Sequence, residues 1–171
     1  PMIRQFLISY LLKKTFAKKE ANQTVNQPFD KKSPSLLIVV KDNSEVAKLK
    51  HTATTLMGKD FGPIEMLQIV SDKFNHSPNQ NKIFPGRLTI KAELPTKDPK
   101  STLPASFDIV LDMDNITDPI ICHYLIKFYP QLMVRFNRDN EKFYNFILPN
   151  EKSDRNARLE QFFTTYQSLK K

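Results

Sequence analysis

The sequence predicts an α/β protein, with a Rossmann-like sheet between two layers of helices and a basic amphipathic helix before it. Two runs, 36–40 and 107–112, have the largely apolar character of strands that are buried on both faces. Each run is followed by polar residues that can cap a helix and then by apolar residues at helical spacing. A repeated order of strand, helix and strand is typical of parallel sheets.

The length and the charge divide the chain into two parts. Its 171 residues suffice for one domain with a hydrophobic core, but not for two of ordinary size. Lysine and arginine outnumber aspartate and glutamate by 26 to 18, and residues 1–32 hold seven basic and two acidic side chains, or +5 of the net +8. We therefore expect a basic helix with its linker at 1–32 and one α/β domain at 33–171.

The composition excludes several classes of protein. One cysteine cannot form an intramolecular disulfide framework or a cysteine-based zinc cluster. The three glycines, at 58, 62 and 86, lie outside the strand-to-helix turns where a Rossmann-type nucleotide site needs them. No glycine-rich phosphate loop and no nucleophile elbow occurs. We therefore expect neither a cofactor nor a bound metal, and the sequence favours a protein without enzymatic activity.

The N-terminal segment predicts an amphipathic helix at about 3–21, followed by a polar linker with two prolines. Its lysine cluster comes after the apolar stripe and consists of Lys13, Lys14, Lys18 and Lys19. Such a helix can dock on its own body or on a second copy, contact RNA or another polyanion, or lie at a membrane surface, which is the least favoured of the three. The apolar run 6–12 is too short to cross a bilayer. A signal peptide fits poorly, because the basic cluster follows the apolar run and no convincing small-residue cleavage site is present.

The body predicts alternating strands and helices. The expected elements, in order, are a strand at 36–40, a helix from about Glu45, a strand at 64–70, a short edge strand at 87–91, a strand at 107–112, a helix capped by Thr117 or Asp118 that ends near 128, strands at 132–136 and 143–148, and a helix at 153–169. A hairpin across 137–142 is one way to join the last two strands. Five prolines between 71 and 106 argue against long regular elements there.

An acidic cluster is the constellation that comes nearest to a catalytic site. Asp112 and Asp114 stand at the end of a predicted central strand, where ligands of open α/β sheets bind, and Ser44 follows the first strand. Two carboxylates could hold Mg²⁺ together with phosphate oxygens. The alternative is that these aspartates only shape the turn and cap the helix, as a strand-to-helix junction requires.

Basic residues interleave with aromatic ones near the end of the predicted sheet. Arg135 and Lys142 each precede a phenylalanine, and Arg138 follows Phe136 by two residues, in a pattern that suits single-stranded RNA. The alternative is that the aromatic rings face the core and the charges are solvated. Cys122 and His123 are adjacent on a predicted helix, so they point about 100° apart and do not form a nucleophile–base pair; Cys122 is expected to be a small core residue.

Several strings carry a resemblance to a known family. The chain has LLIVV early, FDIVLDMDN at 107–115, LMVRFN at 132–137 and FYNFILPN at 143–150, followed by a helix rich in phenylalanine. In this it resembles a family of short, basic, uncharacterised α/β proteins of Bacteroidota. The resemblance implies the fold and a bacterial cytoplasmic setting but assigns no chemistry. A fainter similarity connects the strand–helix–strand pattern to the N-terminal half of heptosyltransferase-type glycosyltransferases, which need a second domain to hold a sugar nucleotide.

From these observations we expect a non-enzymatic interaction domain that docks through its basic N-terminal helix on an anionic partner, RNA or a ribonucleoprotein. One alternative is a small-ligand or nucleotide-sugar-related domain with its site at Asp112, Asp114 and Ser44. Another is a protein-binding or homodimeric module that uses the apolar stripe of the N-terminal helix.

Overall fold

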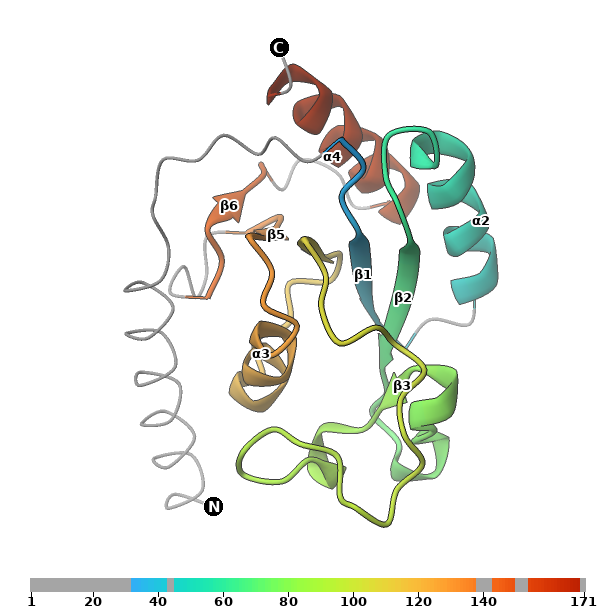
Figure 1. Ribbon diagram of the computed structural model, residues 1–171, viewed down its shortest axis with the longest axis vertical. Helices are drawn as coiled ribbons and strands as arrows, with labels where there is room; N and C mark the ends of the chain where they lie inside the picture. The colour runs from blue at the N-terminus through green and yellow to red at the C-terminus, as the bar shows by residue number, and fades with distance from the viewer. Residues whose placement is uncertain (1–31, 43–44, 138–142, 150–153, 170–171) are drawn as a thin grey trace.

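The computed structural model describes residues 32–42, 45–137, 143–149 and 154–169. Six strands form one sheet in the order β3-β2-β1-β4-β5-β6, and every neighbouring pair is parallel. Figure 1 shows α2 and α4 at one end of the view and α3 with the 71–106 segment at the other. The prediction of an α/β fold is confirmed, whereas the predicted helix at 3–21 lies outside the described residues.

The strands form where the sequence is most apolar. The bounds are β1 (Leu36–Lys41), β2 (Ile64–Ile69), β3 (Lys82–Ile83), β4 (Ile109–Asp112), β5 (Leu132–Arg135) and β6 (Phe146–Ile147). In β1 the five residues 36–40 are all fully buried, because helices or loops cover both faces of the central strands.

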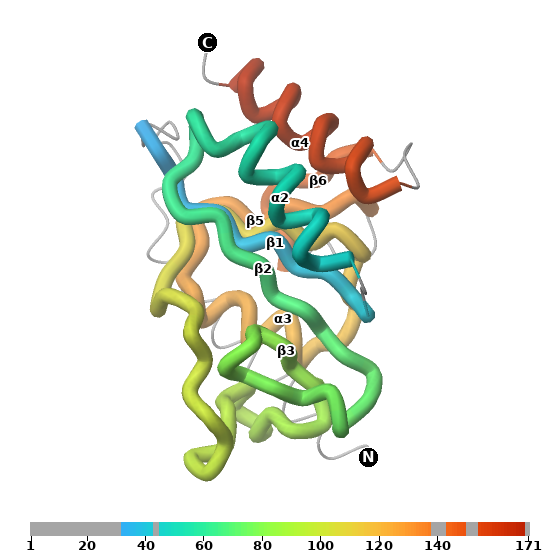
Figure 2. The backbone as a smooth tube through the Cα atoms, turned by 90° about the vertical axis from the view of Figure 1, so that its right-hand side faces the viewer, coloured from blue at the N-terminus to red at the C-terminus, as the bar shows by residue number. Residues whose placement is uncertain are grey.

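Two apolar layers sandwich the sheet. On one face α2 (Val46–Met57) and α4 (Arg155–Leu169) lie side by side, as Figure 2 shows. Leu49 of α2 and Phe162 of α4 join Ile38 of β1 in this core. On the other face α3 (Pro119–Ile126) and part of the 84–107 segment pack against Leu37 and Val39 of β1.

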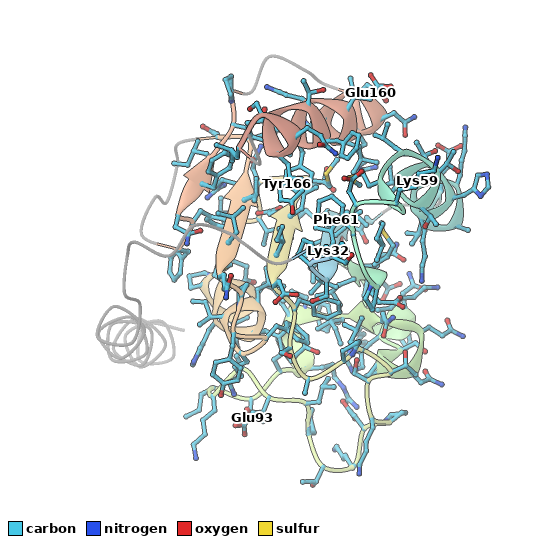
Figure 3. The ribbon with its side chains drawn as sticks, turned by 45° about the horizontal axis from the view of Figure 1, so that its top comes forward. Lys32, Lys59, Phe61, Glu93, Glu160 and Tyr166 are labelled. Carbon is cyan, nitrogen blue, oxygen red and sulfur yellow. The ribbon has the colours of Figure 1, made fainter. Side chains whose placement is uncertain are left out.

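The C-terminal part of α4 packs near the amino ends of the strands. The rings of Phe61 and Tyr166 lie 4.7 Å apart between the loop after α2 and α4, as the labels in Figure 3 indicate. Below them the Asp108 carboxylate accepts hydrogen bonds from both the backbone N–H and the hydroxyl of Ser35, at 2.7 Å each. These bonds tie the starts of β1 and β4 together. Burial raises the pKa of the Tyr166 hydroxyl to about 12, with Asp60 and Asp108 adding to the effect.

Helix α3 follows its predicted signals. Asp118 is the N-cap and its side chain accepts a hydrogen bond from the backbone N–H of Ile120, while Pro119 occupies the first turn. Seven of its eight residues are buried, so α3 is apolar all round rather than amphipathic.

Two predictions about the sheet are wrong. Residues 87–91 form no strand, because Arg87 ends a 3₁₀ turn and the chain then folds back in a turn in which the Ala92 N–H bonds to the Thr89 carbonyl. The edge strand is instead the short β3. The hairpin is also excluded, because β5 and β6 run parallel, with Val134 opposite Phe146. Parallel neighbours need a crossover connection instead of a tight turn.

No helix in the described ranges has both the length and the apolar stretch that crossing a bilayer requires.

Candidate functional site

The strand order places a crevice at the carboxyl edge of the sheet, between β1 and β4. From β1 the chain continues through α2 towards β2, and from β4 it continues through α3 towards β5 on the opposite side. Where successive connections diverge in this way, open α/β sheets bind their ligands. The register puts Asp112 opposite Val39, so Asp114 lies at the level of Lys41.

The crevice is filled by an ion pair of the chain itself. The Asp114 carboxylate accepts a hydrogen bond from the Lys41 N–H at 2.7 Å, and two from Arg155, from Nε at 3.0 Å and Nη2 at 2.7 Å. The same Nη2 donates to the Lys41 carbonyl at 3.1 Å. This hydrogen bonding to Asp114 raises the pKa of Arg155. Arg155 therefore connects α4 to the ends of β1 and β4 at the place where a ligand would enter.

The charge of the recess above this ion pair does not suit a phosphate. Its volume is about 290 Å³, and its charged lining residues are Glu45, Lys48, Asp114, Asp154 and Arg155. Three carboxylates therefore face two cations, and the cations are paired, Lys48 with Glu45 at 3.4 Å and Arg155 with Asp114 at 2.7 Å. An anionic group would meet net negative charge here.

Asp112 lies below the crevice and has no exposed surface. Its carboxylate accepts hydrogen bonds from the Tyr144 hydroxyl at 2.7 Å and from the backbone N–H groups of Ile116, at 2.7 Å, and Asp114, at 3.1 Å. Burial raises the pKa of this carboxyl, while these bonds and Arg135 oppose the rise. The carboxylate holds the turn that presents Asp114, as the turn-shaping alternative predicts.

Arg135 and Cys122 complete this buried cluster. The Arg135 guanidinium lies 4.5 Å from the centre of the Tyr144 ring, and the Cys122 sulfur is 4.0 Å from the Tyr144 hydroxyl. Burial, with Asp112 nearby, raises the pKa of the Cys122 thiol to about 12 and raises that of Tyr144 well above its usual value. At neutral pH such a thiol is protonated and buried, so it is not a nucleophile.

The predicted polyanion-binding residues divide into two groups. Arg135 is fully buried, so this residue does not offer a guanidinium to a partner on the surface, and the prediction fails for it. The neighbouring Phe136 is buried in the core, in agreement with the alternative that the aromatic rings of this segment face the interior. The remaining residues of that prediction lie outside the described ones: Lys13, Lys14, Lys18, Lys19, Arg138 and Lys142.

Of the predicted ligand or metal set, Ser44 lies outside the described residues, and the structure separates the other two members. Asp112 is buried below the turn, while Asp114 is held by Arg155 near the surface. Among the described residues, no three histidine, cysteine or acidic side chains are arranged to hold a metal ion.

A second recess at the same edge was not found from the sequence. This groove, which we call the Phe74 groove after the exposed ring beside it, lies at the ends of β1, β2 and β3 and has a volume of about 440 Å³. Its lining residues are Asp42, Val46, Ala47, Gln68, Val70, Asn75 and Lys82. The feature of the sequence that could have indicated this groove is the string Lys73-Phe74-Asn75, in which an aromatic residue stands between polar ones.

A trio of polar side chains, of which His76 and Asp98 are buried and Arg87 is exposed, supports the chain next to the groove. His76 Nδ1 accepts a hydrogen bond from the Phe84 N–H at 3.0 Å, so the proton of the neutral ring is on Nε2, which lies 3.1 Å from Asp98 Oδ2. Asp98 Oδ1 accepts a second bond from Arg87 Nη2 at 2.7 Å. His76 directly follows the turn that carries Phe74, so the trio fixes one end of this turn.

Comparisons with protein families, with curated protein sequences and with solved structures found no match to this chain. The resemblance to the Bacteroidota family therefore stays a prediction.

Proposed function

We propose that this protein is a non-enzymatic interaction domain of the cytoplasm that binds RNA, with the lysine-rich N-terminal segment as the main electrostatic contact and a Rossmann-like body behind it. The observation that carries the proposal is the filled crevice. The sheet has the strand order of nucleotide-binding proteins, yet Asp114, Arg155 and the backbone of Lys41 bond to one another where the ligand would bind.

The positive charge supports an anionic partner. Residues 1–32 contain seven basic and two acidic side chains, and the other 139 residues are close to balanced with 19 basic and 16 acidic ones. A short segment with this excess attracts a polyphosphate chain and releases its condensed counterions on binding. The partner is RNA rather than a mononucleotide, because several separated lysines can each neutralise a different phosphate.

The test is a salt titration of binding to a single-stranded RNA oligonucleotide, with the full chain. We expect affinity to fall steeply with salt, and substitution of Lys13, Lys14, Lys18 and Lys19 by glutamine to reduce the slope of log affinity against log salt by about 3. The matched control substitutes four exposed lysines of the body by glutamine: Lys59, Lys91, Lys97 and Lys100.

The control variant has the same change in net charge, but its log affinity should depend on log salt with nearly the slope of the wild type. Equal effects of the two quadruple variants would show that only total charge matters and would overturn the assignment to the N-terminal segment. Absence of binding, or an affinity that does not depend on salt, would overturn the proposal itself. Sedimentation of the same samples would then reveal whether the chain forms a homodimer instead.

A further inference from the structure

The Phe74 groove has features that the proposed function does not use. It is open at the carboxyl edge of the sheet, and its lining combines apolar groups of Val46, Ala47 and Val70 with the amides of Gln68 and Asn75. Its volume of about 440 Å³ is in the range of small-ligand sites. Figure 1 shows the chain after β2 turning below the sheet towards β3.

Phe74 presents an aromatic ring to solvent beside the groove. It is 84% exposed, in the 3₁₀ turn Lys73–Asn75, whose last residue lines the groove. The side chain of Asp72 caps this turn by accepting a hydrogen bond from the Phe74 N–H at 2.9 Å. At the other end of the turn, the His76 ring accepts a hydrogen bond from the Phe84 N–H. An exposed ring on a turn fixed at both ends is preorganised for stacking.

Two ammonium groups, one over the Phe74 ring and one in the lining of the groove, have no carboxylate partner among the described residues. Lys73 Nζ lies 5.0 Å from the centre of the Phe74 ring, and Lys82 lines the groove. The two acids next to them in the chain or the lining, Asp42 and Asp72, accept hydrogen bonds from neutral groups, Asp42 from the N–H and hydroxyl of Ser71 and Asp72 from the N–H of Phe74. The charges of the two acids and the two lysines therefore balance, whereas carboxylates outnumber cations in the recess between β1 and β4. Neither lysine is held by a carboxylate in the described part of the chain, so both ammonium groups are able to contact an external anion.

These groups match the parts of one nucleotide. A base can stack on an exposed aromatic ring, a contribution of about 1–3 kcal/mol per base. The amide side chain of Asn75 can bond to an edge of the base, and lysines can contact the flanking phosphates. A protein partner would be expected to need a larger apolar patch than a single ring surrounded by polar groups.

We propose that the Phe74 groove binds one unpaired nucleotide of a single-stranded RNA, with the base stacked on Phe74 and its phosphates close to Lys73 and Lys82. This inference rests on the proposed function for the identity of the polymer. It adds a second contact, on the body, to the lysine-rich segment at the N-terminus.

The absence of tryptophan from the chain allows a direct test. In Phe74→Trp the only indole lies beside the groove, and stacking with a base should quench its fluorescence when a single-stranded RNA oligonucleotide is added. The matched control is Tyr129→Trp, because Tyr129 is 80% exposed, almost as much as Phe74, but follows α3 at the amino edge of the sheet. We expect quenching in Phe74→Trp only. Equal quenching in both variants, or no quenching in either, would overturn the proposal that the Phe74 groove binds a nucleotide.

Affinity provides a second readout. Phe74→Leu should weaken RNA binding by about 5- to 100-fold, the equivalent of one lost stacking contact. Lys82→Gln should reduce the salt slope by about 0.7. The controls Tyr129→Leu and Lys59→Gln should leave both quantities unchanged. Because Phe74 is exposed, its variants should unfold at the same temperature as the wild type.

The two proposals fail in different ways. If wild-type protein does not bind RNA, the proposed function is overturned together with the groove. If the lysine substitutions at the N-terminus weaken binding and Phe74→Leu does not, the groove alone is overturned.

Discussion

Two recesses at the carboxyl edge of the same sheet are built in opposite ways. The crevice between β1 and β4 is filled by Asp114 and Arg155, which bond to each other and to both backbone groups of Lys41. The Phe74 groove, at the ends of β1, β2 and β3, has lysines without carboxylate partners among the described residues and an exposed ring beside it.

The connections explain the difference. Helix α4 begins above the crevice, with Asp154 accepting a hydrogen bond from the Ala157 N–H, so Arg155 in its first turn reaches the strand ends. Between β2 and β3 the chain has only short 3₁₀ turns, and no helix extends over the strand ends there. In this protein the place usually occupied by a ligand is closed, and the open surface lies one strand away.

Removing the buried carboxylate below the crevice should have the largest effect. Asp112→Ala would remove the buried carboxyl on which the charge of Arg135 acts and would deprive Tyr144 of its acceptor. We expect the free energy of unfolding to fall by about 3–5 kcal/mol, measured by urea denaturation. Asp118→Ala, which removes only the cap of α3, should cost about 1 kcal/mol. Equal losses in the two variants would show that the buried cluster contributes no more than a helix cap.

The support of the groove can be tested through Asp98. Asp98→Ala removes the acceptor shared by His76 and Arg87, and should lower the stability by about 1–3 kcal/mol. Hydrogen exchange of the Phe84 N–H, which bonds to His76, should accelerate while exchange in β1 changes less. Glu93→Ala breaks only the solvent-exposed ion pair with Lys127 and should change stability by less than about 1 kcal/mol. Unchanged exchange at Phe84 would contradict the assigned role of the trio.

The buried thiol predicts how the cluster below the crevice responds to alkali. The pKa of Cys122 rises from 9.0 to about 12 through burial, so above pH 9 the unfolded chain loses this proton while the folded chain keeps it. The unfolded state then binds fewer protons, and the contribution of Cys122 to stability falls as pH rises from 9 towards 12, by up to about 1.4 kcal/mol per pH unit. As the pH rises, the wild type should therefore lose stability relative to Cys122→Ala by this amount. Urea denaturation of both proteins at pH 8, 9.5 and 10.5 measures the difference. A difference that stays constant over this range would mean that the thiol is not shielded from solvent.

The ion pair in the crevice should give the smallest effect. A double-mutant cycle with Asp114→Asn and Arg155→Met should yield a coupling energy of about 0.5–1 kcal/mol, because both side chains are partly exposed. The coupling should decrease in high salt. A coupling of zero at low salt would show that the pair fills the crevice without stabilising it.

Much of the fold could be predicted because its signals are local. The strand at 36–40, the helix capped by Thr117 or Asp118 and the helix at 153–169 all follow from neighbouring residues, and they are confirmed in β1, in α3, where Asp118 is the cap, and in α4. The predicted strand at 87–91 failed because the alternation of apolar and polar residues there arises from a turn in which Leu88 and Ala92 are buried.

The candidate site was harder to predict than the elements around it. Asp112 and Asp114 are two residues apart and look equivalent in the sequence, yet one is enclosed by Tyr144 and backbone groups and the other meets Arg155, 41 residues later. Arg135 stood in a pattern typical of an RNA-binding surface but packs over Tyr144 in the interior. Charge alone does not say whether a side chain is solvated or paired.

The sequence by itself determined the class of the fold, the central strands at 36–40 and 107–112, the cap of α3 and the concentration of positive charge in residues 1–32, because propensity, capping and composition are properties of nearby residues. Only the tertiary structure decided the order and the parallel pairing of the strands, the filling of the crevice and the opening of the groove. These depend on contacts between residues far apart in the chain, such as Lys41, Asp114 and Arg155, which the register of the sheet and the packing of α4 bring together.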